Sequence, residues 1–169
     1  MYNLYETKKG AVRDVEKICM FTGHRNINAR HTNTLAESVD QLLEKLIEEG
    51  YTEFRTGGAV GFDTLVALKL LEKKRKYGFI KLHLFLPCRD QDKGWKDNLR
   101  SVYHFVLEQA DSIRYTSESY FSGCMHKRNR EMVKGSELCV AYCGRTTGGT
   151  AYTVNYARKN GLRVINIFE

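Results

Sequence analysis

Three short glycine-bearing stretches of the sequence have the residue types that hold an anionic ligand. They read TGHR at residues 22–25, TGGAVGFD at residues 56–63 and GRTTGGT at residues 144–150. Glycine lets a backbone come close to a ligand, and the free N–H groups at the start of a following helix favour negative charge. Each stretch is therefore either a phosphate-binding turn or a plain turn between a strand and a helix.

Polar side chains in these turns extend the same chemistry. Arg25 can pair with a phosphate through two parallel hydrogen bonds. Asp63 can cap the N–H groups of a helix or accept a hydrogen bond from a ribose hydroxyl, and the sequence leaves both roles open. The predicted ligand-binding residues of the three turns are Thr22, Gly23, Arg25, Gly57, Gly58, Gly61, Asp63, Thr147, Gly148, Gly149 and Thr150.

Two further segments supply candidates outside the turns. In SGCMHKRNREMVKG, at residues 122–135, Arg128 and Asn129 follow Met125 by three and four positions, on the buried side of a helix, which favours a ligand role for that pair. Trp95, the one tryptophan, either stacks on a nucleotide base or fills the edge of the core. The lysine-rich residues 69–81 are typical of a solvated helix face and are also the best candidate for weak nucleic-acid contact.

The apolar pattern predicts strands that alternate with helices. The predicted strands span residues 18–21, 52–56, 80–87, 112–115, 138–143 and 164–168. The predicted helices span residues 34–49, with a capping box from Thr34 to Glu37 and a stop at Gly50, then 63–77, 97–110, 123–134, and a last helix ending near residue 160. This order predicts an α/β fold with a doubly wound, mostly parallel sheet and helices on both faces. Because ligands of such folds bind at the carboxyl ends of the strands, the glycine turns are expected to meet in one pocket.

Length and composition set the wider frame. The 169 residues suit one domain over residues 18–169 after a polar leader at residues 1–17. A formal net charge of +7 favours anionic partners. No stretch resembles a signal peptide or a membrane span, so we expect a cytoplasmic protein without membrane contact. The five cysteines form no C-x-x-C pair, and no metal site is expected. No lysine follows Gly149, which argues against a P-loop ATPase.

Taken in order, TGHR, TGGAVGFD, the tryptophan loop, MHKRNREM and GGT resemble the SMF/DprA-LOG (SLOG) superfamily, most closely its YpsA-like branch. The resemblance covers residues 18–168. It implies a Rossmann-like fold that binds nucleotides or nucleotide-derived ligands, and it implies a homodimer paired through helices. In this superfamily, DprA members bind single-stranded DNA, and LOG members hydrolyse the N-glycosidic bond of cytokinin riboside monophosphates.

The sequence departs from the LOG pattern at the residues that carry catalysis. Arg128 matches the arginine of the first LOG motif, but the two glutamates of the second motif fall on Val154 and Asn155, and its proline falls on Thr147. Neither Val154 nor Asn155 can offset a cationic transition state. LOG activity would therefore need Asp63 or Glu131 as a substitute carboxylate.

The leading hypothesis is a small module that senses or sequesters a nucleotide-derived ligand of the ADP-ribose, cyclic ADP-ribose or NAD type, with no obligatory cofactor. Arg25 and Arg128 would hold phosphate, Asp63 or Asn129 would contact ribose, and Trp95 would stack on the base. N-glycoside hydrolysis of a nucleoside monophosphate is one alternative. DprA-like binding of single-stranded DNA, favoured by the positive charge and the lysine-rich helix, is the other.

Overall fold

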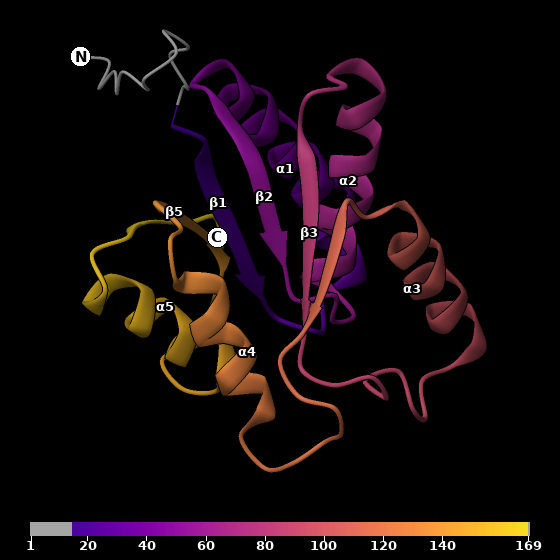
Figure 1. Ribbon diagram of the computed structural model, residues 1–169. Helices are drawn as coiled ribbons and strands as arrows, with labels where there is room; N and C mark the ends of the chain where they lie inside the picture. The colour runs from indigo at the N-terminus through magenta and orange to yellow at the C-terminus, as the bar shows by residue number, and fades with distance from the viewer. Residues whose placement is uncertain (1–14, 169) are drawn as a thin grey trace, which may run out of the picture.

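The computed structural model describes residues 15–168, in which strands and helices alternate along the chain (Figure 1). The strands are β1 (Lys17–Gly23), β2 (Tyr51–Thr56), β3 (Lys81–Leu86), β4 (Ser112–Tyr115), β5 (Leu138–Tyr142) and β6 (Arg163–Asn166). The helices are α1 (Thr32–Glu48), α2 (Phe62–Lys76), α3 (Asp97–Gln109), α4 (Cys124–Val133) and α5 (Gly149–Lys159), and a short 3-10 turn, η1 (Ala29–His31), precedes α1.

The six strands form one sheet in the order β4-β3-β2-β1-β5-β6, and every described strand pair is parallel. This confirms the doubly wound sheet predicted from the sequence. Strand order reverses between β1 and β5, where Thr22 pairs with Ala141 and Gly23 with Tyr142. In open α/β sheets this reversal leaves a crevice at the carboxyl ends of the two strands.

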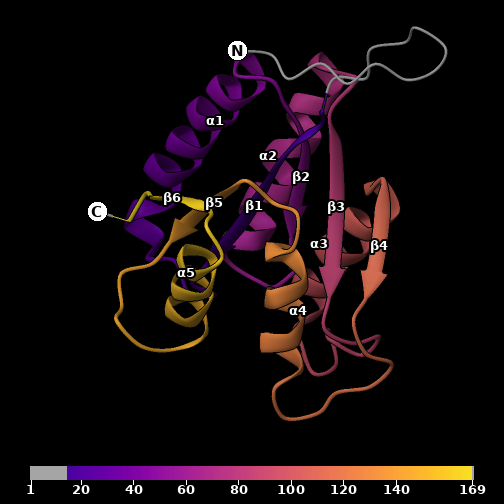
Figure 2. The same ribbon diagram turned by 60° about the vertical axis from the view of Figure 1, so that its left-hand side comes forward.

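Helices cover both faces of the sheet, as expected. Helix α2 packs between α1 and α3 on one face, and α4 packs against α5 on the other. Figure 2 shows α4 and α5 in front of the sheet and α1 behind it. A layer of helices on each face is what a sheet with apolar side chains on both sides requires.

The apolar patterns of β1 and β3 explain the core. Cys19, Met20 and Phe21 in β1 are all fully buried, because this central strand faces helices on both sides. In the segment around β3, Ile80, Leu82, Leu84 and Leu86 alternate toward the α1–α3 face and are at most 1% exposed. A smaller cluster with Met20, Met132 and Cys139 lies under α4 and α5.

Two local predictions were wrong in detail. Helix α1 begins at Thr32, so Thr34 lies inside its first turn and the predicted capping box does not form. Instead, the side chain of Asn28 caps η1 by accepting a hydrogen bond from the Arg30 N–H (3.0 Å), and α1 continues from that turn. The last strand was predicted to reach residue 168, but β6 ends at Asn166, and Phe168 lies beside Gly144.

The predicted polar leader lies largely outside the described residues, which begin at residue 15, and Lys17 already belongs to β1. In the described part of the chain, none of the helices combines the length and hydrophobicity needed to cross a bilayer.

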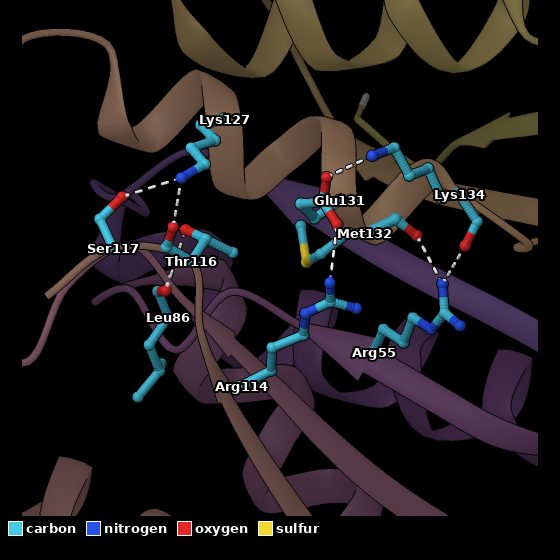
Figure 3. A network of polar contacts seen from close by, with 9 residues as sticks. All are labelled: Arg55, Leu86, Arg114, Thr116, Ser117, Lys127, Glu131, Met132 and Lys134. Carbon is cyan, nitrogen blue, oxygen red and sulfur yellow. Dashed lines mark hydrogen bonds and ion pairs between the residues drawn. The ribbon is translucent and has the colours of Figure 1, made fainter.

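Helix α4 is fastened to the sheet near both of its ends (Figure 3). Near its start, Lys127 Nζ donates to the Thr116 carbonyl oxygen at 2.6 Å. At its end, Arg55 Nη1 donates to the Met132 carbonyl oxygen at 3.1 Å and to the Lys134 carbonyl oxygen. A cation at the last carbonyl oxygens of a helix donates to acceptors that have no N–H partner within the helix. These contacts fix the position of α4, and therefore of Arg128, relative to the sheet.

Candidate functional site

Arg128 lies beneath α4 at the carboxyl ends of β2 and β3. Its side chain is buried, and its Nη1 donates to the carbonyl oxygens of Gly57 and Phe85, the latter at 3.1 Å. Burial lowers the pKa of Arg128, although the nearby Asp63 carboxylate opposes that effect. The predicted burial of this arginine is confirmed. Its Nη1 is engaged by main-chain oxygens, so Arg128 forms a buried support beneath the carboxyl ends of the strands.

Asp63 lies in the first turn of α2, and its carboxylate and the Arg128 guanidinium both approach Gly57. A Cβ built on Gly57 would overlap the guanidinium of Arg128 and would lie 2.7 Å from Asp63 Oδ2. The Asp63 carboxylate accepts a hydrogen bond from the Ala59 N–H at 3.2 Å. Burial raises the pKa of Asp63, against the opposing charge of Arg128. The helix-capping role left open by the sequence does not form, because α2 has no side-chain cap and Ala59 lies in the turn before the helix.

A chain of hydrogen bonds joins Arg128 to the start of α5. Arg128 Nε donates to Asn129 Oδ1 at 2.6 Å, and Asn129 Nδ2 donates to Thr153 Oγ1 at 2.7 Å. The Thr153 hydroxyl then donates to the Gly149 carbonyl oxygen at 2.8 Å. Because Arg128 also bonds Gly57, the second and third glycine turns are linked through buried side chains. The structure thus brings Gly57, Arg128 and Gly149 to one edge of the sheet.

Most of the predicted glycines make room for the protein itself. A Cβ on Gly23 would overlap the ring of Phe62, and a Cβ on Gly61 would overlap the Arg25 carbonyl oxygen. A Cβ on Gly58 would lie 2.6 Å from Leu86 Cδ2. Gly148 and Gly149 differ, because a Cβ on either would point into open space. The turn before α5 is therefore the glycine turn that faces outward.

The start of α5 presents free donors at this outward turn. Residues 146–149 are exposed, which includes the predicted Thr147, and Thr150 is half-buried. Gly148 takes a φ of 96°, which lets the chain enter the helix without a side-chain cap. The first N–H groups of a helix have no acceptor within it and carry partial positive charge. An anion placed here would be stabilised by α5.

A cavity of about 560 Å³ lies beside this turn, at the reversal point between β1 and β5. Its size is within the usual range of small-molecule sites. Two guanidinium groups, two imidazoles, two amides and two aromatic rings give it a basic, partly apolar lining. The lining residues are His24, Arg25, Asn26, Asn28, His31, Tyr142, Gly144, Arg145 and Phe168.

Of the residues predicted from the sequence, Arg25 lines this cavity. Its Nη2 lies 3.8 Å from Met125 Sδ, and Arg128 Nη2 lies 3.9 Å from the same sulfur, so Arg25 connects the cavity with the buried Arg128. Thr22 is buried within β1, close behind. Trp95 is elsewhere: its ring packs on Tyr103 of α3, with centroids 5.2 Å apart, which fits the core-edge role.

Sequence reasoning missed His31, Asn26, Asn28, Arg145 and Phe168. The available signal was positional, because Asn26, Asn28 and His31 lie in the connection after β1, Arg145 lies in the connection after β5, and these two strands flank the reversal point. Without the strand order, their position at this point cannot be identified. Phe168 gave no signal, since it was assigned to the last strand.

His24 acts as a neutral hydrogen-bond acceptor at the cavity wall, because its Nε2 accepts from the Gly144 N–H at 2.8 Å. Burial, with a smaller contribution from Arg145, lowers the pKa of His24. The stabilisation from the neutral ring is complete above its unfolded pKa of about 6.5 and is lost as pH falls through the lower folded value. We therefore expect His24→Gln to lose less unfolding free energy than the wild type between about pH 7 and about pH 5. Urea unfolding at both pH values measures this, and equal losses would contradict it.

The carboxylates considered as catalytic substitutes are engaged elsewhere. Glu131 pairs with Arg114 at 3.1 Å and with Lys134, at the β4 side of α4 (Figure 3). The hydrogen bond from Lys134 lowers the pKa of Glu131, so it is ionised at neutral pH. Among the described residues, no group of three or more His, Cys, Asp or Glu side chains is placed to hold a metal ion.

The lysine-rich segment at residues 69–81 is neutralised by carboxylates. Each of its five lysines makes an ion pair within 3.3 Å. The pairs join Lys69 to Glu72, Lys73 to Asp40 and Glu44, Lys74 to Asp111, Lys76 to Glu44, and Lys81 to Glu53. This arrangement fits a solvated helix face, and it leaves little free charge there for a nucleic acid.

A parallel six-stranded sheet of this order, with helices on both faces, defines a Rossmann-like α/β domain. The family model described as YspA SLOG family matches residues 19–164. The chain therefore belongs to the YpsA family of the SLOG superfamily, which confirms the resemblance predicted from the ordered motifs.

Relatives and solved structures agree with that assignment. The uncharacterized SPbeta prophage-derived protein YoqJ of Bacillus subtilis (strain 168) is 30% identical over 145 residues, which cover 76% of this chain and 85% of YoqJ. One similar solved structure is that of the DNA processing protein A of Helicobacter pylori, described for its single-stranded DNA binding mode. The two structures superpose with a TM-score of 0.63 at 18% identity, and the match covers 88% of this chain and 63% of the Helicobacter pylori chain. The match to DprA from Streptococcus pneumoniae has a TM-score of 0.60 at 15% identity, and it covers 88% of this chain and 49% of the DprA chain. At these identities, the two structures support the fold.

Proposed function

We propose that this protein binds a nucleotide-derived ligand of the ADP-ribose, cyclic ADP-ribose or NAD type in the cavity between the ends of β1 and β5. The observation that carries the proposal is a basic cavity of about 560 Å³ at the reversal point of the sheet, lined in part by Gly144 and Arg145 of the turn that leads to the uncapped start of α5. Binding without an obligatory cofactor suits a sensing or sequestering module.

The chemistry of the lining residues indicates which part of the ligand each would contact. Arg25 and Arg145 would hold the phosphates, together with the N–H groups at Gly149 and Thr150. Tyr142 and Phe168, whose ring centroids lie 4.9 Å apart, offer an apolar wall for a base or ribose. Arg128 supports this arrangement from below, because its Nη1 donates to main-chain oxygens and its Nε donates to Asn129 Oδ1.

A thermal-shift screen against a panel of nucleotides tests the proposal. A ligand at 100 times its Kd adds about 2.7 kcal/mol to the free energy of unfolding, which gives a shift of several degrees. We expect Arg145→Ala to reduce the shift strongly because the cavity loses a guanidinium. Arg158→Ala is the matched control, since Arg158 is exposed on the last turn of α5. No shift with any nucleotide, or an equal loss in both variants, would contradict the proposal.

Single-stranded DNA is the second candidate ligand. The likeness to the DNA processing protein A of Helicobacter pylori supports it, as do two exposed aromatic side chains in the loop before α4, Tyr120 (65% exposed) and Phe121 (46% exposed). Base stacking on such rings contributes about 1–3 kcal/mol per base. The lysine-rich segment supports it less, because its charges are paired.

Salt dependence distinguishes DNA binding from binding of a small nucleotide. If DNA is the ligand, the affinity for oligothymidylate falls steeply with salt, and Tyr120→Ala with Phe121→Ala weakens it by about 10-fold or more. Phe79→Ala is the matched control. Phe79 is 58% exposed and lies just before β3, at the amino-terminal ends of the strands. A flat salt response, or equal effects of Phe79→Ala and the Tyr120/Phe121 pair, would eliminate DNA.

N-glycoside hydrolysis has the least support. The described residues lining the cavity include no carboxylate, and Asp63 is buried, with its carboxylate accepting a hydrogen bond from the Ala59 N–H. We therefore expect no adenine release when AMP is incubated with the protein, as followed by chromatography. Release of adenine that disappears in Asp63→Asn would reverse this conclusion.

A further inference from the structure

A second group of chemically active side chains lies on the sheet away from the cavity. Alternation places Arg55 in β2, His83 in β3, and Ser112 and Arg114 in β4 on the same face of the sheet, the face that carries α4. His83 pairs in register with Arg55 on one side and with Ser112 on the other. The beginnings of these strands extend past the end of α4, so Ser112 is exposed and His83 is half-buried.

Three side chains on this face, those of Ser112, His83 and Glu53, are linked by hydrogen bonds. The Ser112 hydroxyl lies 2.6 Å from His83 Nδ1. The other ring nitrogen, Nε2, is hydrogen-bonded to Glu53 Oε2. The Glu53 side chain is 9% exposed and that of His83 is 20% exposed, so the carboxylate is shielded and the serine is open to solvent. Hydroxyl, imidazole and buried carboxylate in this order are the parts of an activated serine nucleophile.

The hydrogen-bond pattern sets the direction of proton flow. Ionised Glu53 can only accept, so His83 carries its proton on Nε2 and donates it to Glu53. Nδ1 is then an acceptor and takes the hydrogen bond from the Ser112 hydroxyl. The imidazole is therefore held in the tautomer that can remove the serine proton, and its carboxylate partner stabilises the imidazolium that results.

Basic side chains surround this trio. Lys81 Nζ lies 3.3 Å from Glu53 Oε1. Arg55 and Arg114 lie over the ring of Phe85, with guanidinium carbons 5.1 and 5.7 Å from its centroid. Arg114 pairs with Glu131 at 3.1 Å, whereas the hydrogen bonds of Arg55 within the described residues go to main-chain and hydroxyl oxygens. The charge of Arg55 favours a substrate with a negative group near its reactive carbonyl, and it favours the oxyanion formed on attack.

We propose that Ser112, His83 and Glu53 form an acyl-transfer site that hydrolyses small carboxylic esters carrying a negative charge. This site is independent of the proposed nucleotide cavity. Ser112 is the nucleophile, His83 the general base and acid, and Glu53 the residue that positions His83.

The reaction balances without a co-reactant other than water. Ser112 Oγ forms a bond to the carbonyl carbon as its proton moves to His83 Nδ1, and the bond to the leaving alkoxide breaks as that proton is returned to it. Water then attacks the acyl-serine and gives one proton to His83 Nδ1. The bond from the acyl carbon to Oγ breaks, Oγ regains the proton, and a carboxylic acid leaves.

Acylation of the full chain by mono(4-nitrophenyl) succinate tests the proposal. We expect a burst of nitrophenolate and a succinyl group on the peptide that contains Ser112, found by mass spectrometry. Ser112→Ala abolishes both, whereas Ser119→Ala, which removes an exposed serine from the loop that follows β4, leaves them unchanged. His83→Gln slows acylation by about 100-fold. Acylation at another residue, or an unchanged rate in Ser112→Ala, would overturn the proposal.

The role of Glu53 needs a measurement that a merely structural role would not move. We expect Glu53→Gln to slow acylation, Glu53→Asp to restore part of the rate, and both variants to unfold at the wild-type temperature within a few degrees. Equal acylation rates in Glu53→Gln and the wild type would remove Glu53 from the site. The neutral ester 4-nitrophenyl acetate should react more slowly than the succinate, and an equal or faster rate would overturn the preference for charged substrates.

Discussion

Replacing Arg128 with methionine lowers the free energy of unfolding by about 3–5 kcal/mol. The change removes the donor to the carbonyl oxygens of Gly57 and Phe85, and both lie where water cannot replace it. It also leaves the Asp63 carboxylate buried without the guanidinium that offsets its charge. Urea unfolding followed by circular dichroism measures the loss. We expect it to exceed that of any exposed arginine in the chain.

The adjacent residue in α4 provides the control. Lys127 is exposed and donates to the Thr116 carbonyl oxygen and, at 3.5 Å, to Ser117 Oγ, so Lys127→Met should cost no more than about 1 kcal/mol. Adding Asp63→Asn to Arg128→Met should recover part of the loss, because a neutral amide replaces the stranded charge. A cost below about 1 kcal/mol for Arg128→Met, or strict additivity of the two changes, would contradict the role assigned to Arg128.

Gly61→Ala has the second large effect, with an expected loss of about 3 kcal/mol or more. Gly61 has a φ of 83°, which alanine adopts only with strain. In addition, the new Cβ would overlap the Arg25 carbonyl oxygen, and a backbone atom there cannot rotate aside. Because Phe62 N–H donates to the His24 carbonyl oxygen at 3.1 Å, any shift also opens the junction between β1 and α2.

Gly50→Ala isolates the backbone part of that cost. Gly50 has a similar φ of 90°, and no atom lies within 4 Å of a Cβ built on it. We therefore expect Gly50→Ala to cost about 1–2 kcal/mol, the price of the positive φ alone. Thermal and urea unfolding of the two variants give the difference. Equal losses would show that the approach of Gly61 to Arg25 contributes nothing.

The fold followed from the hydrophobic pattern to within a few residues. The alternation through β3 permits one arrangement, because a shift by one residue would expose its buried side chains. The continuous apolar run in β1 indicates a strand with helices on both faces. The helix start was harder to place, since Asn28 caps a 3-10 turn that leads into α1, and Thr34 and Glu37 have equally good cap chemistry in the sequence.

The site was only partly predictable, because glycine serves two purposes that look alike in sequence. Gly23 and Gly61 make space for Phe62 and for the Arg25 backbone, whereas Gly148 and Gly149 face open space. The burial of Arg128 followed from its helical position relative to Met125, but its contact with the Gly57 carbonyl depends on which strands meet α4. The position of the cavity depends on β1 and β5 being neighbours in the sheet. A sequence pattern of parallel strands with helical connections does not determine which strands are neighbours.

The most direct test of the central claim is the map of backbone amide shifts in 15N-labelled protein titrated with the nucleotide that gives the largest thermal shift. We expect the perturbed amides to cluster at His24, Arg25, Gly144, Arg145 and the first turn of α5, with saturable changes that weaken in Arg145→Ala. Shifts centred instead on the outer faces of α2 and α3, or no saturable shift with any nucleotide, would contradict it.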